Sequence, residues 1–72
     1  MDTHHLHGDI KVGFHGDVPE ELARHFNEHY TREGVKHMLD KEEAVIFKGH
    51  KYKIEQPTEE GGIPSFRKSH HY

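Results

Sequence analysis

The chain has 72 residues, no cysteine and a formal net charge of −3 with neutral histidines. This length predicts one small domain with a modest core, and the lack of cysteine excludes disulfides and thiolate metal sites. Hydrophobic residues make up only 31% of the chain and charged residues 32%, so we expect polar, mobile ends.

The first predicted element is a strand near the N-terminus. Residues 1–8 are polar and show no periodicity, so we interpret them as a flexible lead-in. Ile10, Val12 and Phe14 then alternate with Lys11 and Gly13. That alternation is typical of a half-buried strand over residues 9–14.

A helix is expected next, with Asp17 as its N-cap and Glu20 placed as in a capping box. Leu22 and Phe26 share one face at helical spacing. Gly34 is the residue type favoured just past a helix C-terminus. The sequence therefore predicts one helix that ends at Gly34.

The next segments are shorter. Residues 35–39 fit a short strand or another helical turn, and we favour the strand because Val35, His37 and Leu39 alternate. Residues 44–47 and 51–54 read as a hairpin around residues 48–50, with Gly49 in the turn. From residue 56 onward the polar, Pro- and Gly-containing sequence is typical of a linker and a disordered tail.

These elements predict an α+β domain over residues 9–55, with a lead-in over residues 1–8 and a disordered polar tail over residues 56–72. One helix would cover a small, mainly antiparallel sheet in the order β-α-β-β-β, or β-α-β-β without the strand at residues 35–39. The side chains expected in the core are Ile10, Val12, Phe14, Leu22, Phe26, Tyr30, Leu39, Val45, Phe47, Tyr52 and Ile54.

The ten histidines are the most unusual feature of the composition. Their protonation makes the net charge sensitive to pH near 6. His4, His5 and His7 are close together, and His70 and His71 stand at the other end, as imidazoles of a partial metal site could. No motif with defined ligand spacing is present, so we predict no metal site among them.

One histidine pair resembles a two-ligand clip. His25 and His29 are four residues apart and share a helix face. Glu28 does not directly follow the first histidine, so the HExxH zinc motif is absent. We favour a role as polar, surface or half-buried side chains for both histidines, and a histidine-rich metal-binding protein remains an alternative.

No catalytic motif is present. Ser65, Ser69 and Thr31 are the nearest candidates for a hydroxyl nucleophile, and both serines fall in the expected tail. A mobile tail does not hold a base within hydrogen-bond reach of a nucleophile. The chain also lacks a P-loop, a GxGxxG and a GxSxG motif. We therefore predict that the protein is not an enzyme and uses no cofactor.

The candidate contact surface is the basic hairpin together with the tail. Lysines and aromatic residues on a sheet can bind single-stranded nucleic acid, but the net negative charge makes that alternative weaker. An exposed sheet edge and a tail that orders on binding suit a protein partner. The candidate partner-binding residues are Lys48, His50, Lys51, Lys53, Phe66, Arg67 and Lys68.

We therefore predict a small non-enzymatic regulator that binds a larger protein. The most specific hypothesis is a phage-type inhibitor of a host machine such as RNA polymerase, based on what short, acidic, motif-free chains commonly do. The longest apolar run, residues 44–47, is far too short to cross a bilayer. No signal peptide is visible, so we expect a cytoplasmic location and no membrane partner.

Overall fold

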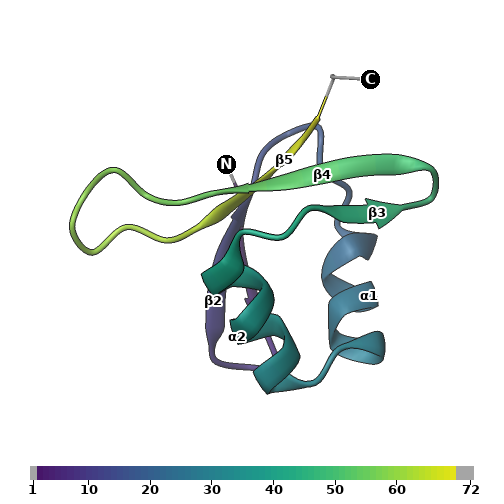
Figure 1. Cartoon of the computed structure of the whole chain (residues 1–72), viewed down its shortest axis with the longest axis horizontal. Helices are drawn as coiled ribbons and strands as arrows, with labels where there is room; N and C mark the ends of the chain where they lie inside the picture. Colours follow the sequence, from purple (N-terminus) through teal and green to yellow (C-terminus); the bar gives the residue numbers. More distant parts are fainter. Residues whose placement is uncertain (1, 70–72) are drawn as a thin grey trace.

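Two helices lie on one side of a five-stranded sheet in the computed structural model, which describes residues 2–69 (Figure 1). The elements in chain order are β1 (Asp2–Leu6), β2 (Ile10–Phe14), α1 (Glu21–His29), α2 (Arg32–Lys41), β3 (Val45–Phe47), β4 (His50–Glu55) and β5 (Ser65–Lys68).

The strands are arranged in the order β1-β2-β5-β4-β3. β2 and β5 are parallel, and every other neighbouring pair is antiparallel. The structure confirms a small α+β fold with a mainly antiparallel sheet. The expected element order was wrong, because the chain forms two helices and its sheet includes both terminal segments.

The predicted single helix is divided in two. α1 begins after Glu20, whose backbone is helical and whose side chain forms no cap hydrogen bond, so the predicted Asp17 cap was wrong. Tyr30 is extended, with φ −119° and ψ 144°, and ends α1. Thr31 then caps α2, because its Oγ1 accepts a hydrogen bond from the Gly34 N–H at 2.9 Å. Gly34 therefore lies in the first turn of α2.

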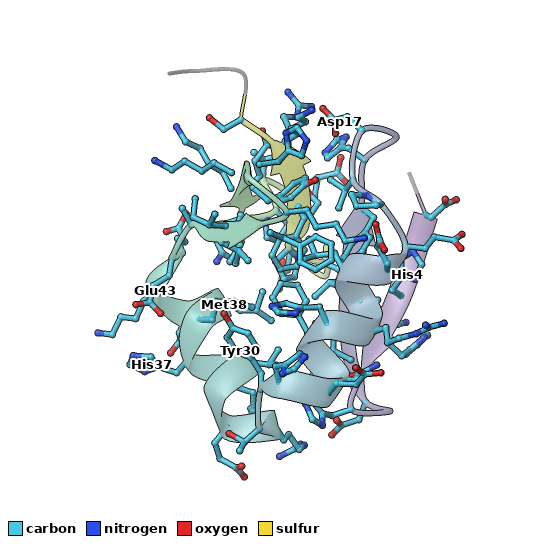
Figure 2. The ribbon with its side chains drawn as sticks, turned by 90° about the vertical axis from the view of Figure 1, so that its right-hand side faces the viewer. His4, Asp17, Tyr30, His37, Met38 and Glu43 are labelled. Atoms are coloured by element: carbon cyan, nitrogen blue, oxygen red, sulfur yellow. The ribbon has the colours of Figure 1, made fainter. Side chains whose placement is uncertain are left out.

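Residues 35–39 belong to α2, so the strand favoured from the sequence was wrong. Val35, Met38 and Leu39 are buried at helical spacing. A strand would have buried His37 beside Val35 and Leu39 and exposed Met38. In the helix His37 is exposed and points away from the body of the protein (Figure 2).

Both segments expected to be flexible contribute a strand. β1 pairs with β2 through a turn in which His7 and Gly8 have positive φ. β5 lies between β2 and β4, inside the sheet. Leu6 from β1 and Phe66 from β5 are both fully buried. The folded region therefore extends well beyond residues 9–55 at both ends, and the predicted flexible ends were wrong over these strands.

The core lies between the sheet and the two helices. The Phe66 ring packs against Phe14 at 5.4 Å and against Phe26 at 5.2 Å between centroids. Most predicted core residues are buried there, while Ile10, Tyr30 and Phe47 are partly buried at its margin. The core also contains five side chains that the sequence analysis did not include: Leu6, Val18, Val35, Met38 and Phe66.

The predicted hairpin is confirmed as β3 and β4. Phe47 and His50 are paired, so Lys48 and Gly49 form the two-residue turn. Both turn residues have positive φ, 51° and 79°. This is the geometry of a type I′ turn, which matches the twist of antiparallel strands.

Candidate functional site

The sheet face that neither helix covers is basic, and we call it the open face. Side chains alternate along a strand, so the partners of the buried core residues point to the open face. Its exposed cations are Lys11 on β2, Lys51 and Lys53 on β4, and Arg67 on β5. Glu55 is the acidic residue among them. A chain with net charge −3 thus gathers positive charge on one face.

Two of these cations lie directly opposite each other. Lys53 and Arg67 are Cα partners in the antiparallel ladder of β4 and β5. Like charges in such a pair destabilise a sheet by about 0.2–1 kcal/mol. Lysines on edge strands can block unwanted pairing, but β4 and β5 both have neighbours on each side. Edge protection therefore does not account for this pair.

An exposed apolar side chain lies beside the cations. Ile46 on β3 is 65% exposed, and its Cα partner on β4 is Lys51. Directly paired residues share a sheet face, so Ile46 belongs to the open face. The face therefore combines an apolar side chain with the positive charge of β4 and β5.

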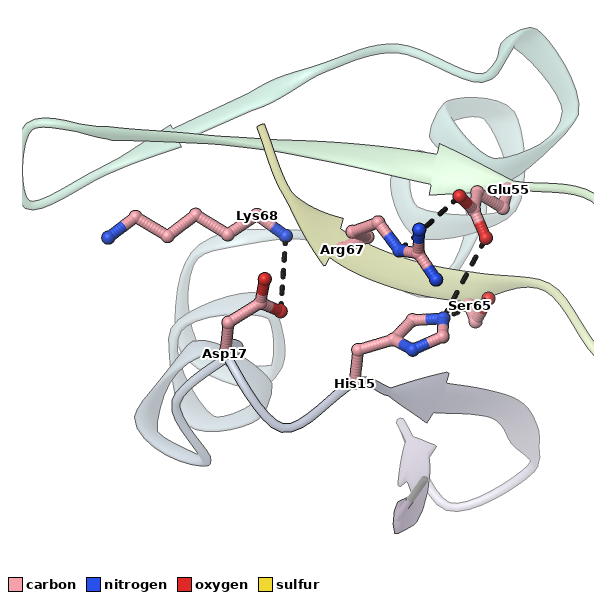
Figure 3. Close-up of polar contacts among 6 residues, drawn as sticks. All are labelled: His15, Asp17, Glu55, Ser65, Arg67 and Lys68. Atoms are coloured by element: carbon pink, nitrogen blue, oxygen red, sulfur yellow. Dashed lines mark hydrogen bonds and ion pairs between the residues drawn. The ribbon is translucent and has the colours of Figure 1, made fainter. Parts of the chain in front are cut away.

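A polar cluster lies at the end of the open face where β2 ends (Figure 3). His15 Nε2 is 3.4 Å from Ser65 Oγ and 3.7 Å from Glu55 Oε2. Arg67 Nε lies 3.4 Å from Glu55 Oε1. Ser65 is buried, with 7% exposure.

This cluster has the residue types of a Ser-His-acid triad but not its geometry. In a triad, one imidazole nitrogen faces the serine and the other is held by the acid. Here the same nitrogen, Nε2, faces both groups. Glu55 therefore does not hold the imidazole nitrogen opposite the one that faces the serine, as the acid of a triad does. The arrangement instead links β2, β5 and β4, and Arg67 joins it through Glu55.

The structure divides the candidate partner-binding residues. Lys51, Lys53 and Arg67 lie together on the open face. Lys48, in the hairpin turn, forms an ion pair with Glu21 of α1 at 2.7 Å. Phe66 is fully buried, so its place in the contact surface was wrong.

His50 and Lys68 lie on the opposite side of the sheet from the open-face cations. His50 is two residues from the buried Tyr52 on β4 and therefore points to the same side, and Lys68 is the Cα partner of Tyr52. The backbone N–H of Lys68 donates to Asp17 Oδ1 at 3.4 Å (Figure 3). These two residues therefore lie on the helix side of the sheet rather than on the open face.

The aromatic residues of the predicted nucleic-acid surface face the core. Tyr52 is 3% exposed and Phe66 is fully buried. Burial raises the pKa of the Tyr52 hydroxyl, with a further contribution from Asp17 and Glu21. Within the described residues, the open face of β4 and β5 therefore presents no Phe, Tyr or Trp ring on which a base could stack.

Two of the clustered N-terminal histidines, His4 and His5, are neighbours on β1 and therefore point to opposite faces of the sheet. His4 pairs with Val12 on the side of the helices, and His5 pairs with Lys11 on the open face. The rings of His25 and His29 do lie side by side, tilted by 43° with 4.9 Å between centroids. Within residues 2–69, however, just one group brings three possible metal ligands together: Asp2, His4 and Glu20. The other candidate ligands, His70 and His71, lie outside the described residues.

Only part of the open face could be predicted from the sequence. Alternation in residues 51–54 correctly indicated Lys51 and Lys53, and alternation in residues 10–14 separated Lys11 from the core. No local signal showed that β5 lies between β2 and β4, which is what brings His15, Glu55 and Ser65 together.

The chain matches no protein-family model, and neither a curated protein nor a solved structure matches it. Neither helix within residues 2–69 has the length and apolar character needed to cross a membrane.

Proposed function

We propose that the protein is a non-enzymatic binding protein that docks its open face on an acidic surface of a larger protein. The observation that carries this proposal is the Lys53–Arg67 pair, two opposed cations on interior strands. Their mutual repulsion costs stability in the free protein. A carboxylate-rich partner would remove that cost by lying over both cations.

Ile46 favours a protein partner over nucleic acid. Protein interfaces combine an apolar centre with complementary charge, and Ile46 beside Lys51 supplies the apolar contact. Single-strand binding relies on stacking aromatics as well as cations, and Tyr52 and Phe66 face the core.

The more specific hypothesis is a regulator of phage type that acts in the cytoplasm and inhibits host RNA polymerase. The open face suits any large acidic protein surface, so this hypothesis needs its own test. Purified bacterial RNA polymerase, immobilised on a biosensor, should bind the wild-type chain and reduce promoter-dependent transcription when saturated. If RNA polymerase neither binds the chain nor loses transcription activity, the RNA polymerase hypothesis is excluded. The broader binding proposal is then tested by the next experiment.

The binding proposal is tested with a matched pair of charge variants, each carrying a tag without histidine. The open-face variant removes three exposed sheet cations: Lys51→Gln, Lys53→Gln and Arg67→Gln. The control variant removes three exposed helix cations: Arg24→Gln, Lys36→Gln and Lys41→Gln. Both variants change the net charge equally, so they differ only in where the charge is removed.

The three proteins serve as bait in nuclease-treated bacterial lysate. We expect the wild-type chain and the control variant to retain the same partner, and the open-face variant to lose it. Retention of no partner above background, or equal retention by both variants, contradicts the proposal. If the wild-type chain retains a partner only in lysate that was not treated with nuclease, the open face binds nucleic acid instead.

A further inference from the structure

Three potential metal ligands meet where β1 approaches the start of α1. Asp2 and His4 are two residues apart on β1 and therefore point to the same side of the strand. Glu20 is the N-cap residue of α1. One ligand atom from each of the three residues lies within 4.8 Å of the other two. Figure 2 shows His4 between β1 and the beginning of α1.

The imidazole of His4 is held in place but has an unused nitrogen. Its ring packs on the Phe14 ring at 4.4 Å between centroids. Its Nε2 is buried and has no hydrogen-bond partner among residues 2–69. A buried polar atom without a partner costs free energy, so such an atom calls for an explanation. An imidazole fixed by packing, with carboxylates beside it, is suited to metal binding.

The two carboxylates are also available. Neither Asp2 nor Glu20 forms an ion pair with another group among residues 2–69. Arg24 lines the same surface hollow as His4 and Glu20, yet it lies beyond ion-pair distance of Glu20. Both acidic side chains are exposed and can rotate. The two carboxylates together balance the charge of a divalent cation.

We propose that Asp2, His4 and Glu20 bind a first-row divalent transition metal such as Zn²⁺ or Mn²⁺. The imidazole ligand disfavours Ca²⁺ and Mg²⁺, which prefer oxygen ligands throughout. Tetrahedral ligands at about 2.1 Å from zinc are about 3.4 Å apart. The carboxylates therefore close on the ion from their present spacing while Phe14 holds the imidazole, and water completes the coordination.

A bound ion would connect the edge strand β1 to the first turn of α1. Near the other end of α1, the His7 N–H in the β1–β2 turn already donates a hydrogen bond to Asn27 Oδ1 at 2.7 Å. A ligand that binds only the folded state stabilises it. Metal binding should therefore raise the melting temperature and protect the amides of β1 from exchange.

The experiment uses Mn²⁺ as a paramagnetic probe on the full-length, ¹⁵N-labelled, chelator-stripped protein. At substoichiometric Mn²⁺, we expect the amide signals of Asp2, His4 and Glu20 to broaden first. One equivalent of Zn²⁺ should displace Mn²⁺ and restore them. Broadening centred on His25 and His29, or spread evenly over the exposed carboxylates, overturns the proposal.

A matched pair of variants separates this site from the other histidines and acids. Asp2→Asn with Glu20→Gln removes both anionic ligands and keeps the side-chain size. Glu28→Gln with Asp40→Asn makes the same charge change on exposed helix positions. We expect the first variant to bind Mn²⁺ at least tenfold more weakly and to lose the Zn²⁺-induced rise in melting temperature.

The control variant should retain both effects, with an unchanged pattern of broadening. The dispersion of the amide spectrum shows that each variant is folded before metal is added. Equal loss in both variants, or unchanged Mn²⁺ affinity in the first, overturns the assignment of the site.

Discussion

Lys53 and Arg67 face each other across the ladder between β4 and β5, on the side of the sheet away from the helices. Arg67 also forms an ion pair with Glu55 on the same face of the sheet. That ion pair offsets part of the positive charge of Arg67 and leaves Lys53 opposite a cation. Loss of the positive charge at Lys53 should therefore increase the stability of the free protein and weaken its binding to an acidic partner.

Replacing Lys53 by threonine should stabilise the protein while weakening partner binding. The change removes the repulsion from Arg67 and adds a residue that favours strands, a gain of about 0.2–1 kcal/mol. Lys51→Thr is the matched control, because the Cα partner of Lys51 on β3 is the uncharged Ile46. Urea unfolding followed by circular dichroism measures both variants. Equal changes in stability would show that the opposed charges do not repel measurably.

Phe66→Ala should destabilise the protein by about 3–5 kcal/mol, because it empties a fully buried site between Phe14 and Phe26. Ile46→Ala, at a site that is 65% exposed, should stay within about 0.5 kcal/mol of the wild type. Urea unfolding compares the two. A loss for Phe66→Ala no larger than that for Ile46→Ala would contradict the central position of β5.

Phe66 also shows why the sequence could not reveal the whole sheet. It is the only strongly apolar residue in β5, and a Pro- and Gly-containing linker precedes it. Its burial comes from parallel pairing with β2, about fifty residues earlier in the chain. Leu6 is likewise the only strongly apolar residue in β1, although its partner strand β2 is adjacent in the chain, so β1 also shows no apolar alternation. Local periodicity detects strands with several alternating apolar residues, such as β2 and β4, and misses strands stabilised by distant partners.

The helix boundaries failed for a different reason. The apolar spacing of Leu22, Phe26 and Tyr30 predicted a helical face correctly up to Phe26. Thr31 then caps the second helix, α2. Its Oγ1 accepts a hydrogen bond from the Gly34 N–H, and this bond competes with continuation of α1. The sequence predicts a helix end at Gly34, but Gly34 lies in the opening turn of α2.

The turn between β3 and β4 depends on glycine at one position. Gly49 has φ +79°, so Gly49→Ala should cost about 1–2 kcal/mol. Gly16→Ala is the control, because Gly16 has no positive φ of this kind and no atom within 4 Å of an added Cβ. It should be neutral or stabilise the protein by up to about 1 kcal/mol. Thermal unfolding of the two variants distinguishes these effects, and similar melting temperatures would contradict the turn assignment.

The Arg32–Asp9 ion pair should make stability depend on pH in the acid range. Arg32 Nε donates to Asp9 Oδ2 at 3.0 Å, and this hydrogen bond is the main reason why the pKa of Asp9 lies below its ordinary value of 3.8. A carboxyl group with a lowered folded-state pKa stabilises the protein above its unfolded-state pKa. That contribution is lost as the pH falls below about 4 and through the lowered pKa of Asp9. Salt should also weaken the contribution, because both side chains of the ion pair are exposed.

Carboxyl ¹³C NMR titration of Asp9 measures this effect directly. Arg32→Gln removes the hydrogen bond and should move the Asp9 midpoint back up toward 3.8. Lys36→Gln is the graded control, because Lys36 lowers the pKa of Asp9 through its charge alone and less strongly than Arg32 does. It should therefore raise the midpoint less than Arg32→Gln does. A larger effect of Lys36→Gln, or no effect of Arg32→Gln, would show that α2 does not hold Asp9 by this pair in solution.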